Sequence, residues 1–141
     1  MINKEPSILL VDDDSLVANA LARMLRAKHY HVSICHDPKQ ALEFCDKFHF
    51  DLIITDQRMP VMDGTEFARL AKRKQSEVRV ILISGYSDIC KVNEACELGV
   101  VHYYVSKPWD NRKLIEVIDD QLLLADMRDS LQQEFKITAV A

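Results

Sequence analysis

Short apolar runs alternate along this chain with longer segments of mixed character. The apolar runs fall at residues 7–11, 30–35, 52–55, 78–83 and 101–105, and most of them are rich in β-branched residues or leucine. Runs of this length that stay apolar at successive positions are typical of strands buried on both faces, as in parallel sheets. The pattern therefore predicts five strands inside one sheet.

Each run is followed by a segment whose apolar residues recur at spacings of three and four, which predicts a helix. These helices begin near residues 15, 38, 64, 87 and 110, with Asp37-Pro38 as a typical start and Gly99 as a typical end. Strands and helices in strict alternation indicate a parallel sheet covered on both faces. The expected fold class is α/β, a (βα)5 doubly wound five-stranded parallel sheet of order 2-1-3-4-5, flavodoxin-like.

Polar side chains follow four of the five expected strands. Asp12 and Asp13 follow the first strand, Asp56 the third, Ser84 the fourth and Lys107 the fifth. In the expected strand order these four strands are neighbours. Because the carboxyl ends of parallel strands meet at one edge of the sheet, these side chains should converge on one cleft.

The chemistry of these side chains indicates a phosphoryl-accepting site. Three crowded carboxylates repel one another and need a cation at neutral pH, and oxygen ligands suit a small hard ion, Mg²⁺ or Mn²⁺. Lys107 would add a second positive charge for phosphoryl oxygens, and Asp56 would be the nucleophile that forms an aspartyl phosphate. Each residue alone also has an ordinary explanation. Asp14 caps the next helix, Ser84 can be a loop hydroxyl, and Lys107 can be a solvated charge.

Composition narrows the class of protein. A chain of 141 residues fits one domain, and its net charge of −4 argues against direct binding to nucleic acid, which needs a concentrated basic surface. No apolar run is long enough to span a membrane, and residues 1–6 do not resemble a signal peptide. The four cysteines lack metal-ligand spacing, which favours reduced thiols. We therefore expect a cytoplasmic protein without membrane contact.

The motifs at these strand ends resemble those of the receiver domains of two-component response regulators. The resemblance covers about residues 7–124 and is carried by residues 8–14, 51–64, 80–85 and 104–108. It implies that Asp56 is the phosphoacceptor and that Lys107 contacts the phosphoryl group. It implies a Mg²⁺ site formed by Asp12, Asp13, Asp56 and the backbone carbonyl of Arg58. It further implies a regulatory domain, not an enzyme, that receives its phosphoryl group from a sensor histidine kinase or a phosphotransfer protein.

The same resemblance implies a switch and a slow loss of the phosphoryl group. Ser84 is implied to be the switch hydroxyl and Tyr104 the switch aromatic, and together they alter the surface of the fourth helix, fifth strand and fifth helix. The candidate contacts on that surface are Lys91, Glu94 and Tyr103. Arg58 and Tyr86 border the path of the hydrolytic water, and both are bulky, which predicts slow autodephosphorylation.

Partners and alternatives follow from finer features. Residues 84–88 and 106–110 are similar to those of receivers attached to HD-GYP-type cyclic-dinucleotide phosphodiesterases, so an effector domain or protein of that kind is an expected partner.

The alternative to a receiver domain is a haloacid-dehalogenase-like phosphatase, because Asp12 and Asp14 match that family's opening pair, with Asp12 as nucleophile. Leu16 departs from that pattern, and the chain is short for its cap. A flavodoxin-like cofactor binder is disfavoured, since three aspartates in the first loop repel an anionic phosphate.

The end of the chain departs from a simple receiver. We expect the receiver domain to span residues 1–124 and residues 125–141 to form a C-terminal helical extension or linker. Leu124, Met127, Leu131 and Phe135 recur there at spacings of three and four. One interpretation is a frayed, solvated end, because short isolated helices are marginal in water. The other is a helix that pairs with an effector or with a second copy, which would give a homodimer.

Overall fold

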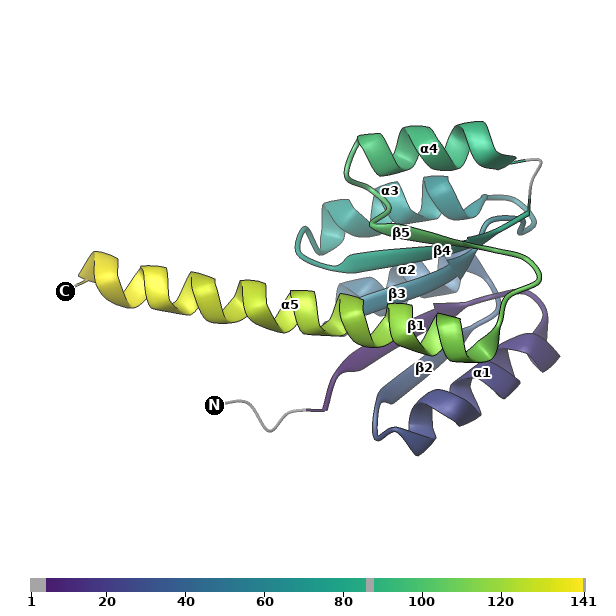
Figure 1. Cartoon of the computed structure of the whole chain (residues 1–141). Coiled ribbons are helices and arrows are strands. Elements are labelled where there is room, and N and C mark those ends of the chain that lie inside the picture. Colours follow the sequence, from purple (N-terminus) through teal and green to yellow (C-terminus); the bar gives the residue numbers. More distant parts are fainter. Residues whose placement is uncertain (1–4, 86–87, 141) are drawn as a thin grey trace.

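The computed structural model describes residues 5–85 and 88–140, and the side chains of residues 5–85 and 88–132. The five strands are all parallel and hydrogen-bonded in the order β2-β1-β3-β4-β5, which confirms the expected topology (Figure 1). The elements are β1 (Ser7–Val11), α1 (Ser15–Ala27), β2 (His31–Cys35), α2 (Pro38–Lys47), β3 (Leu52–Asp56), α3 (Gly64–Lys74), β4 (Arg79–Ser84), α4 (Ile89–Glu97), β5 (Tyr103–Ser106) and α5 (Asn111–Val140).

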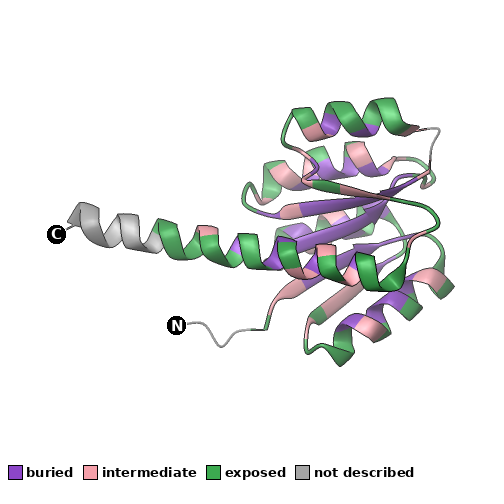
Figure 2. Ribbon diagram, viewed as in Figure 1, coloured by how far each residue is buried: buried purple, intermediate pink, exposed green. Residues whose placement is uncertain are grey.

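Helices cover both faces of the sheet. On one face Leu25 of α1 and Ile118 of α5 pack in the same cluster as Ile54 of β3. On the other face Phe67 of α3 packs in a cluster with Ile53, the preceding residue of β3, and α2 and α4 join it there. Because successive strand residues point to opposite faces, a central strand covered twice must be apolar at each position. The buried strands in Figure 2 show this arrangement.

The strand register aligns the carboxyl ends. Val11 of β1 pairs with Thr55 of β3, so the residues that follow, Asp12 and Asp56, lie at the same level. On the other side of β3, Asp56 pairs with Ile83, one residue before Ser84. The ladder between β4 and β5 ends at Ser84 and Ser106, directly before Lys107. The sheet therefore delivers its polar ends to one edge.

Three strands begin later than the apolar pattern predicts, β2 and β4 by one residue and β5 by two. β5 starts at Tyr103 because the Val101 N–H donates to the carbonyl of Ala95 at the end of α4 (3.2 Å), whereas the His102 N–H donates to β4 at Val80 O (2.9 Å). β4 is displaced by one residue and includes Ser84. The fourth helix, expected from about residue 87, is described from Ile89, and residue 87 lies outside the described residues.

α5 is one continuous helix of 30 residues that runs past the sheet (Figure 1). Among its described side chains, those of residues 111–132, the last well-buried one is Ala125, which is 8% exposed. Beyond it, Arg128 Nη1 donates to the carbonyl (3.3 Å) and to the carboxylate (2.8 Å) of Glu77 in the connection between α3 and β4. Residues 125–140 are therefore helical, and the division of the chain after residue 124 stays a prediction. Among the described residues, no helix combines the length and the apolar character needed to cross a membrane.

Candidate functional site

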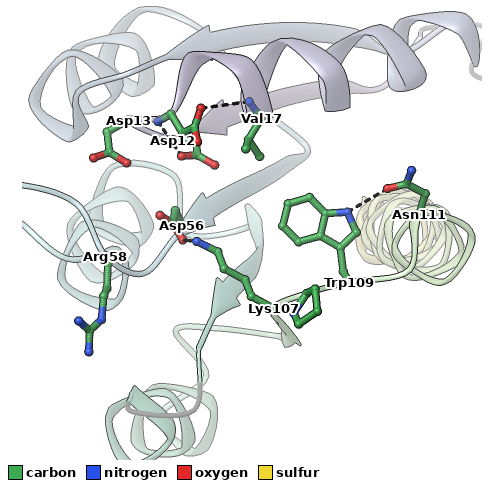
Figure 3. A pocket seen from close by; sticks show the side chains of 10 residues that line it. Asp12, Asp13, Val17, Asp56, Arg58, Lys107, Trp109 and Asn111 are labelled. Atoms are coloured by element: carbon green, nitrogen blue, oxygen red, sulfur yellow. Dashed lines mark hydrogen bonds and ion pairs between the residues drawn. The ribbon is translucent and has the colours of Figure 1, made fainter.

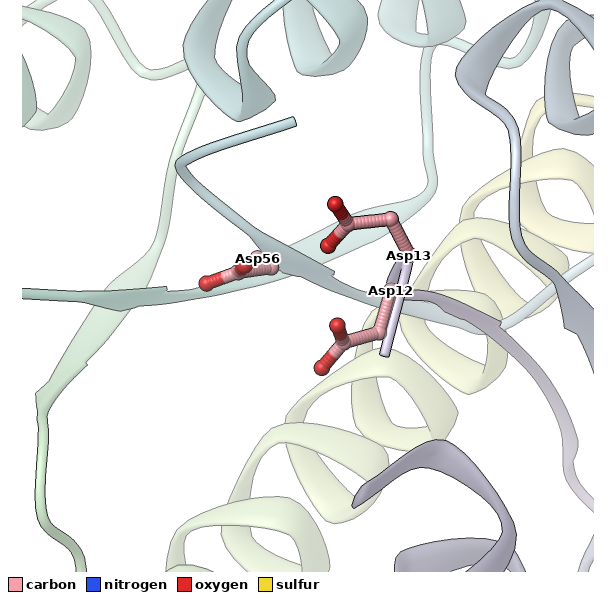
Figure 4. Close-up of side chains that lie close together, drawn as sticks. All are labelled: Asp12, Asp13 and Asp56. Atoms are coloured by element: carbon pink, nitrogen blue, oxygen red, sulfur yellow. The ribbon is translucent and has the colours of Figure 1, made fainter. Parts of the chain in front are cut away.

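Three carboxylates meet at the carboxyl edge of the sheet (Figure 4). Asp56 is the last residue of β3, and Asp12 and Asp13 directly follow β1. Carboxylate oxygens of the three residues lie within 4.8 Å of one another. Asp12 and Asp56 are each only 5% exposed, whereas Asp13 is open to solvent. Two buried negative charges and one solvated charge thus share one small volume.

The environment of Asp12 raises the pKa of its carboxyl group. Burial raises the pKa of Asp12 to about 6, and the neighbouring Asp56 carboxylate contributes to the increase. The Asp14 N–H opposes it by donating a hydrogen bond to Asp12 Oδ1 (2.9 Å). Asp14 itself caps α1, as expected, because its side chain accepts from the N–H groups of Leu16 and Val17. A cation among the three carboxylates would favour their ionised forms.

Lys107 supplies the positive charge closest to Asp56. Its Nζ lies 2.7 Å from Asp56 Oδ1 (Figure 3). The backbone prepares this contact, since the Lys107 N–H donates to the carbonyl of Ser84 (2.9 Å) at the end of the β4–β5 ladder. Within the described part of the chain, no donor meets Asp56 Oδ1 with hydrogen-bond geometry, although the oxygen is buried. One ion pair therefore compensates a carboxylate that still has acceptor capacity.

The other residues expected at the site differ in their surroundings. Ser84 is buried, and its hydroxyl donates to the carbonyl of Gly85 (3.0 Å). Tyr104 is half-buried on β5 and packs against the cluster under α2, α3 and α4, outside the carboxylate pocket. Arg58 lines the pocket, but its Nε donates to the carboxylate of Asp88 at the start of α4 (3.2 Å). Tyr86 lies outside the described residues.

Several residues at the site were not identified from the sequence. Gln57 is buried beside Asp56. Its carbonyl accepts from the Gly64 N–H (2.9 Å), and its side-chain oxygen accepts from the Thr65 N–H (2.9 Å). A polar residue after a strand resembles any loop residue, so no sequence signal marks this role. Gln57 fastens the first turn of α3 to the end of β3 and so holds the loop that follows Asp56.

An apolar wall faces the carboxylates across a cavity of about 1000 Å³ (Figure 3). Val17 of α1 and Trp109 form it, and the Trp109 Nε1–H donates to Asn111 Oδ1 (3.0 Å), which fixes the indole. The sequence signal for Trp109 is its place directly after Lys107-Pro108 at the end of β5. The cavity is wider than a phosphoryl group alone requires, and it leaves room for the group that carries it.

The donor set fits a hard divalent cation. Oxygens of three carboxylates lie within 4.8 Å of one another, and the buried Asp56 Oδ1, although it is 2.7 Å from Lys107 Nζ, is met by no donor with hydrogen-bond geometry in the described residues. Carboxylate oxygens are ligands of the kind that Mg²⁺ takes. Lys107 and the open side of the cavity leave space for an anion beside such an ion. The arrangement is therefore suited to binding and transferring a phosphoryl group.

Comparison with known proteins identifies the family. The family model of the response regulator receiver domain matches residues 8–119 of this chain. The chain is a receiver domain. Receivers of this family belong to two-component response regulators, in which an aspartate carries the phosphoryl group, so the haloacid-dehalogenase alternative has no support.

Individual relatives place this receiver among known regulators. It is similar, at 34% identity, to the cyclic di-GMP phosphodiesterase response regulator RpfG of Xanthomonas campestris pv. campestris, over 90% of this chain and 34% of that one. A structure described as adenylate cyclase from Rhodopirellula baltica superposes with a TM-score of 0.89 at 29% identity, covering 94% of this chain and 98% of that chain. The signal receiver domain of an HD domain-containing protein from Pseudomonas fluorescens superposes with a TM-score of 0.85 at 26% identity, covering 92% and 96%. The receiver spans only 24% to 58% of the length of transcriptional regulators that it matches.

Proposed function

We propose that Asp56 of this receiver accepts a phosphoryl group from the phosphohistidine of a sensor histidine kinase or phosphotransfer protein. An Asp56 oxygen forms the new bond to phosphorus while the N–P bond of the donor breaks and its electron pair returns to the imidazole. The observation that carries the proposal is the placement of the Asp56 carboxylate, buried beside Lys107 and within 4.8 Å of Asp12 and Asp13. Of the three clustered carboxylates, Asp56 is the one that lies beside Lys107, and Asp12 and Asp13 are assigned to the cation.

The other residues are assigned to charge and position. Asp12, Asp13, Asp56 and the backbone carbonyl of Arg58 would hold Mg²⁺ or Mn²⁺, and the ion would supply positive charge to the phosphoryl oxygens. Lys107 Nζ, now paired with Asp56, would move to a phosphoryl oxygen, since that group brings more negative charge than the carboxylate it modifies. The Val17 and Trp109 wall would exclude water from the side of the cavity opposite the carboxylates.

Intact-mass analysis after incubation with a small phosphodonor tests the assignment. We expect one phosphoryl group on the wild type with Mg²⁺, none after chelation, and none on Asp56→Asn. Asp14→Asn is the matched control, because Asn also caps helices and Asp14 lies beside the cluster without being a member of it. Equal labelling of Asp56→Asn and wild type would refute the proposal. Labelling lost only in Asp12→Asn would indicate Asp12 as the nucleophile.

We further assign Ser84 and Tyr104 to the response. Phosphorylation would draw the Ser84 hydroxyl from the Gly85 carbonyl towards the phosphoryl group, and the half-buried Tyr104 ring would turn into the space that is left. The surface formed by α4, β5 and α5 would then change, with the candidate contacts Lys91, Glu94 and Tyr103. Nuclear magnetic resonance of ring-labelled tyrosine, with and without a phosphoryl mimic, tests this. An unchanged Tyr104 rotamer would exclude the switch role.

Arg58 and Tyr86 are assigned to the lifetime of the aspartyl phosphate. Both positions border the expected path of the hydrolytic water, and Arg58 lines the pocket. We expect slow autodephosphorylation in wild type and faster decay in the double variant Arg58→Ala with Tyr86→Ala. Decay that is unchanged or slower in the double variant would contradict shielding.

The output partner is proposed to be an effector that acts in the cytoplasm on a cyclic dinucleotide. The support is the similarity to a receiver of a cyclic di-GMP phosphodiesterase regulator and to the receiver of an HD domain-containing protein. A pull-down with such a phosphodiesterase domain tests it, using wild type and Asp56→Asn in the presence of a phosphodonor. Binding that ignores both the donor and Asp56 would argue against phosphorylation-dependent output.

A further inference from the structure

A group of basic side chains lies at the amino ends of β4 and β5, at the opposite edge of the sheet from the three carboxylates. They come from α3, β4, the connection before β5, and α5, and each contacts or belongs to the backbone stretch 77–80. All of them are half-buried. The members of this basic cluster are Lys72, Arg79, His102 and Arg128.

Lys72 and Arg79 are held in place without an acidic partner. Lys72 Nζ donates to the carbonyl of Val78 (2.8 Å), and Arg79 Nε donates to the side-chain oxygen of Gln121 on α5 (2.6 Å), so both cations are bound to neutral oxygens. Within the described residues, no carboxylate forms an ion pair with either of them, and no oxygen accepts from Arg79 Nη1 or Nη2. Burial lowers the pKa of both side chains, and the nearby Arg128, another cation, lowers it further. Charges that lose water on folding are normally paired, and these two are not.

His102 adds a neutral hydrogen-bond donor to the cluster. Its Nδ1 accepts from the Val80 N–H (3.0 Å), and burial together with the neighbouring cations lowers its pKa to about 4. The ring is therefore neutral near pH 7 and carries its proton on Nε2. In the part of the chain that the structure describes, this Nε2–H meets no acceptor. N–H groups without acceptors thus occur on both Arg79 and His102.

The charge of the cluster matches that of a doubly charged anion. The charged groups that shift the pKa of Lys72, Arg79 and His102 are these residues themselves, Arg128 and Glu77. The Glu77 carboxylate pairs with Arg128 Nη1 (2.8 Å) and so offsets one of three positive charges. Two positive charges remain, in a chain whose net charge is −4. One carboxylate would compensate only half of this charge, whereas a phosphate dianion compensates all of it and accepts hydrogen bonds on several oxygens.

We infer that the basic cluster binds a phosphate dianion, either free phosphate or the phosphate group of a small molecule. Arg79 would donate Nη1–H and Nη2–H to two phosphate oxygens, which is the geometry that its planar guanidinium favours. The His102 Nε2–H would donate to a further oxygen, and Lys72 would add its charge. Because Arg79 belongs to β4 and Arg128 to α5, the anion would join the sheet to the helix at the point where the helix leaves it (Figure 1).

Nuclear magnetic resonance of the full chain in metal-free buffer tests the inference, with inorganic phosphate as the probe. We expect saturable shifts of the His102 Nε2 and Arg79 Nε signals, and no comparable shifts with sodium acetate or sodium chloride at the same ionic strength. Arg79→Gln should weaken phosphate binding about tenfold or more, because it removes charge-assisted hydrogen bonds. Arg73→Gln is the matched control and should bind as wild type does, since Arg73 is exposed on α3 beside Lys72 but is no member of the cluster. Asp56→Asn should also bind normally, so this test is independent of phosphorylation.

A second variant and two further probes complete the experiment. Lys72→Gln should also weaken binding, and circular dichroism confirms that each variant is folded. Adenosine monophosphate that binds more tightly than inorganic phosphate would indicate a small molecule as the source of the phosphate, and equal binding would indicate free phosphate. Shifts that do not saturate, that chloride reproduces, or that persist in both Arg79→Gln and Lys72→Gln would overturn the site. A response to a polyglutamate peptide without one to phosphate would overturn it as well and make an acidic protein segment the occupant.

Discussion

Gly64, the first residue of α3, is a position where one added methyl group should disturb both stability and the phosphorylation site. A Cβ there would lie 2.4 Å from the carbonyl oxygen of Asp56, 2.7 Å from Leu82 Cδ1 and 3.0 Å from the Cα of Gln57. Two of these atoms belong to the backbone at the end of β3, and Leu82 is buried in the sheet, so none can move freely. The substitution Gly64→Ala therefore forces the phosphoacceptor strand and the helix apart.

Two opposing effects determine how much Gly64→Ala changes the free energy of unfolding. Overpacking of a well-packed interior costs about 1–3 kcal/mol, while replacing glycine in a helix returns up to about 1 kcal/mol through backbone entropy. We expect a net loss of about 1–2 kcal/mol in the free energy of unfolding, or about 3–6 °C in Tm for a domain of this size. The displaced Asp56 carbonyl should also slow phosphorylation from a small phosphodonor, because the carboxylate on the same residue moves with it.

Thermal and urea unfolding measure the effect, and Gly85→Ala provides the control. A Cβ at Gly85 meets no atom of the described residues within 4 Å, and the φ of Gly85 is not in the left-handed region. The control should therefore stay within about 0.5 kcal/mol of the wild type. If Gly64→Ala is as stable as Gly85→Ala, the close contact between α3 and β3 does not limit this site and the reasoning fails.

Three further predictions concern acid, metal and backbone strain. Val80 N–H donates to His102 Nδ1 (3.0 Å), and burial, with Arg79, Lys72 and Arg128 nearby, lowers the pKa of His102 to about 4. The unfolded chain therefore takes up this proton first as the pH falls below about 6.5, and the contribution of His102 to stability should drop by about 1–2 kcal/mol between about pH 7 and pH 5, allowing for solvent screening. Urea unfolding at both pH values should show this drop as the difference between wild type and His102→Asn, because the raised pKa of Asp12, which acts in the opposite direction, is common to both. Asp13→Asn should raise Tm in metal-free buffer by relieving carboxylate repulsion and should reduce the further rise on adding Mg²⁺; a full Mg²⁺ response in that variant would exclude Asp13 as a ligand. Val61 is exposed at a φ of 74°, which is unfavourable for a β-branched residue, so Val61→Asn should gain about 1 kcal/mol in urea unfolding, and a loss would show that the loop tolerates valine without strain.

The architecture and the centre of the site could be predicted because both depend on local periodicity. Runs such as residues 52–54 of β3 are apolar at successive positions only when both faces are buried, and this alone indicates a doubly covered parallel sheet. Once the strand order is known, the carboxyl ends of neighbouring strands must meet. Asp12, Asp13, Asp56 and Lys107 could therefore be brought together from the sequence alone.

The surroundings of the site could not be predicted, because they depend on hydrogen-bond partners far apart in the sequence. Gln57 resembles a loop residue until its two contacts with the first turn of α3 are seen. The pairing of Arg58 with Asp88 joins residues on different connections, and either could equally have been solvated. The start of β5 was displaced because the backbone of Val101 closes the end of α4 before the chain joins the sheet. Such choices between competing backbone acceptors leave no periodic signal.

The unbroken course of α5 has a mechanical consequence. Residues 126–140 form about 22 Å of helix beyond Ala125, at ~1.5 Å per residue. The described side-chain hydrogen bonds beyond Ala125 join Arg128 and Gln132 to Glu77 at the surface, and such surface pairs are weak enough for the helix to tilt as a lever. A tilt of about 10° at Ala125 sweeps the far end through roughly 4 Å, many times the movement at the root. Because α5 is built into one face of the sheet, a displacement too small to detect beside Asp56 can reach the end of the helix as an amplified swing.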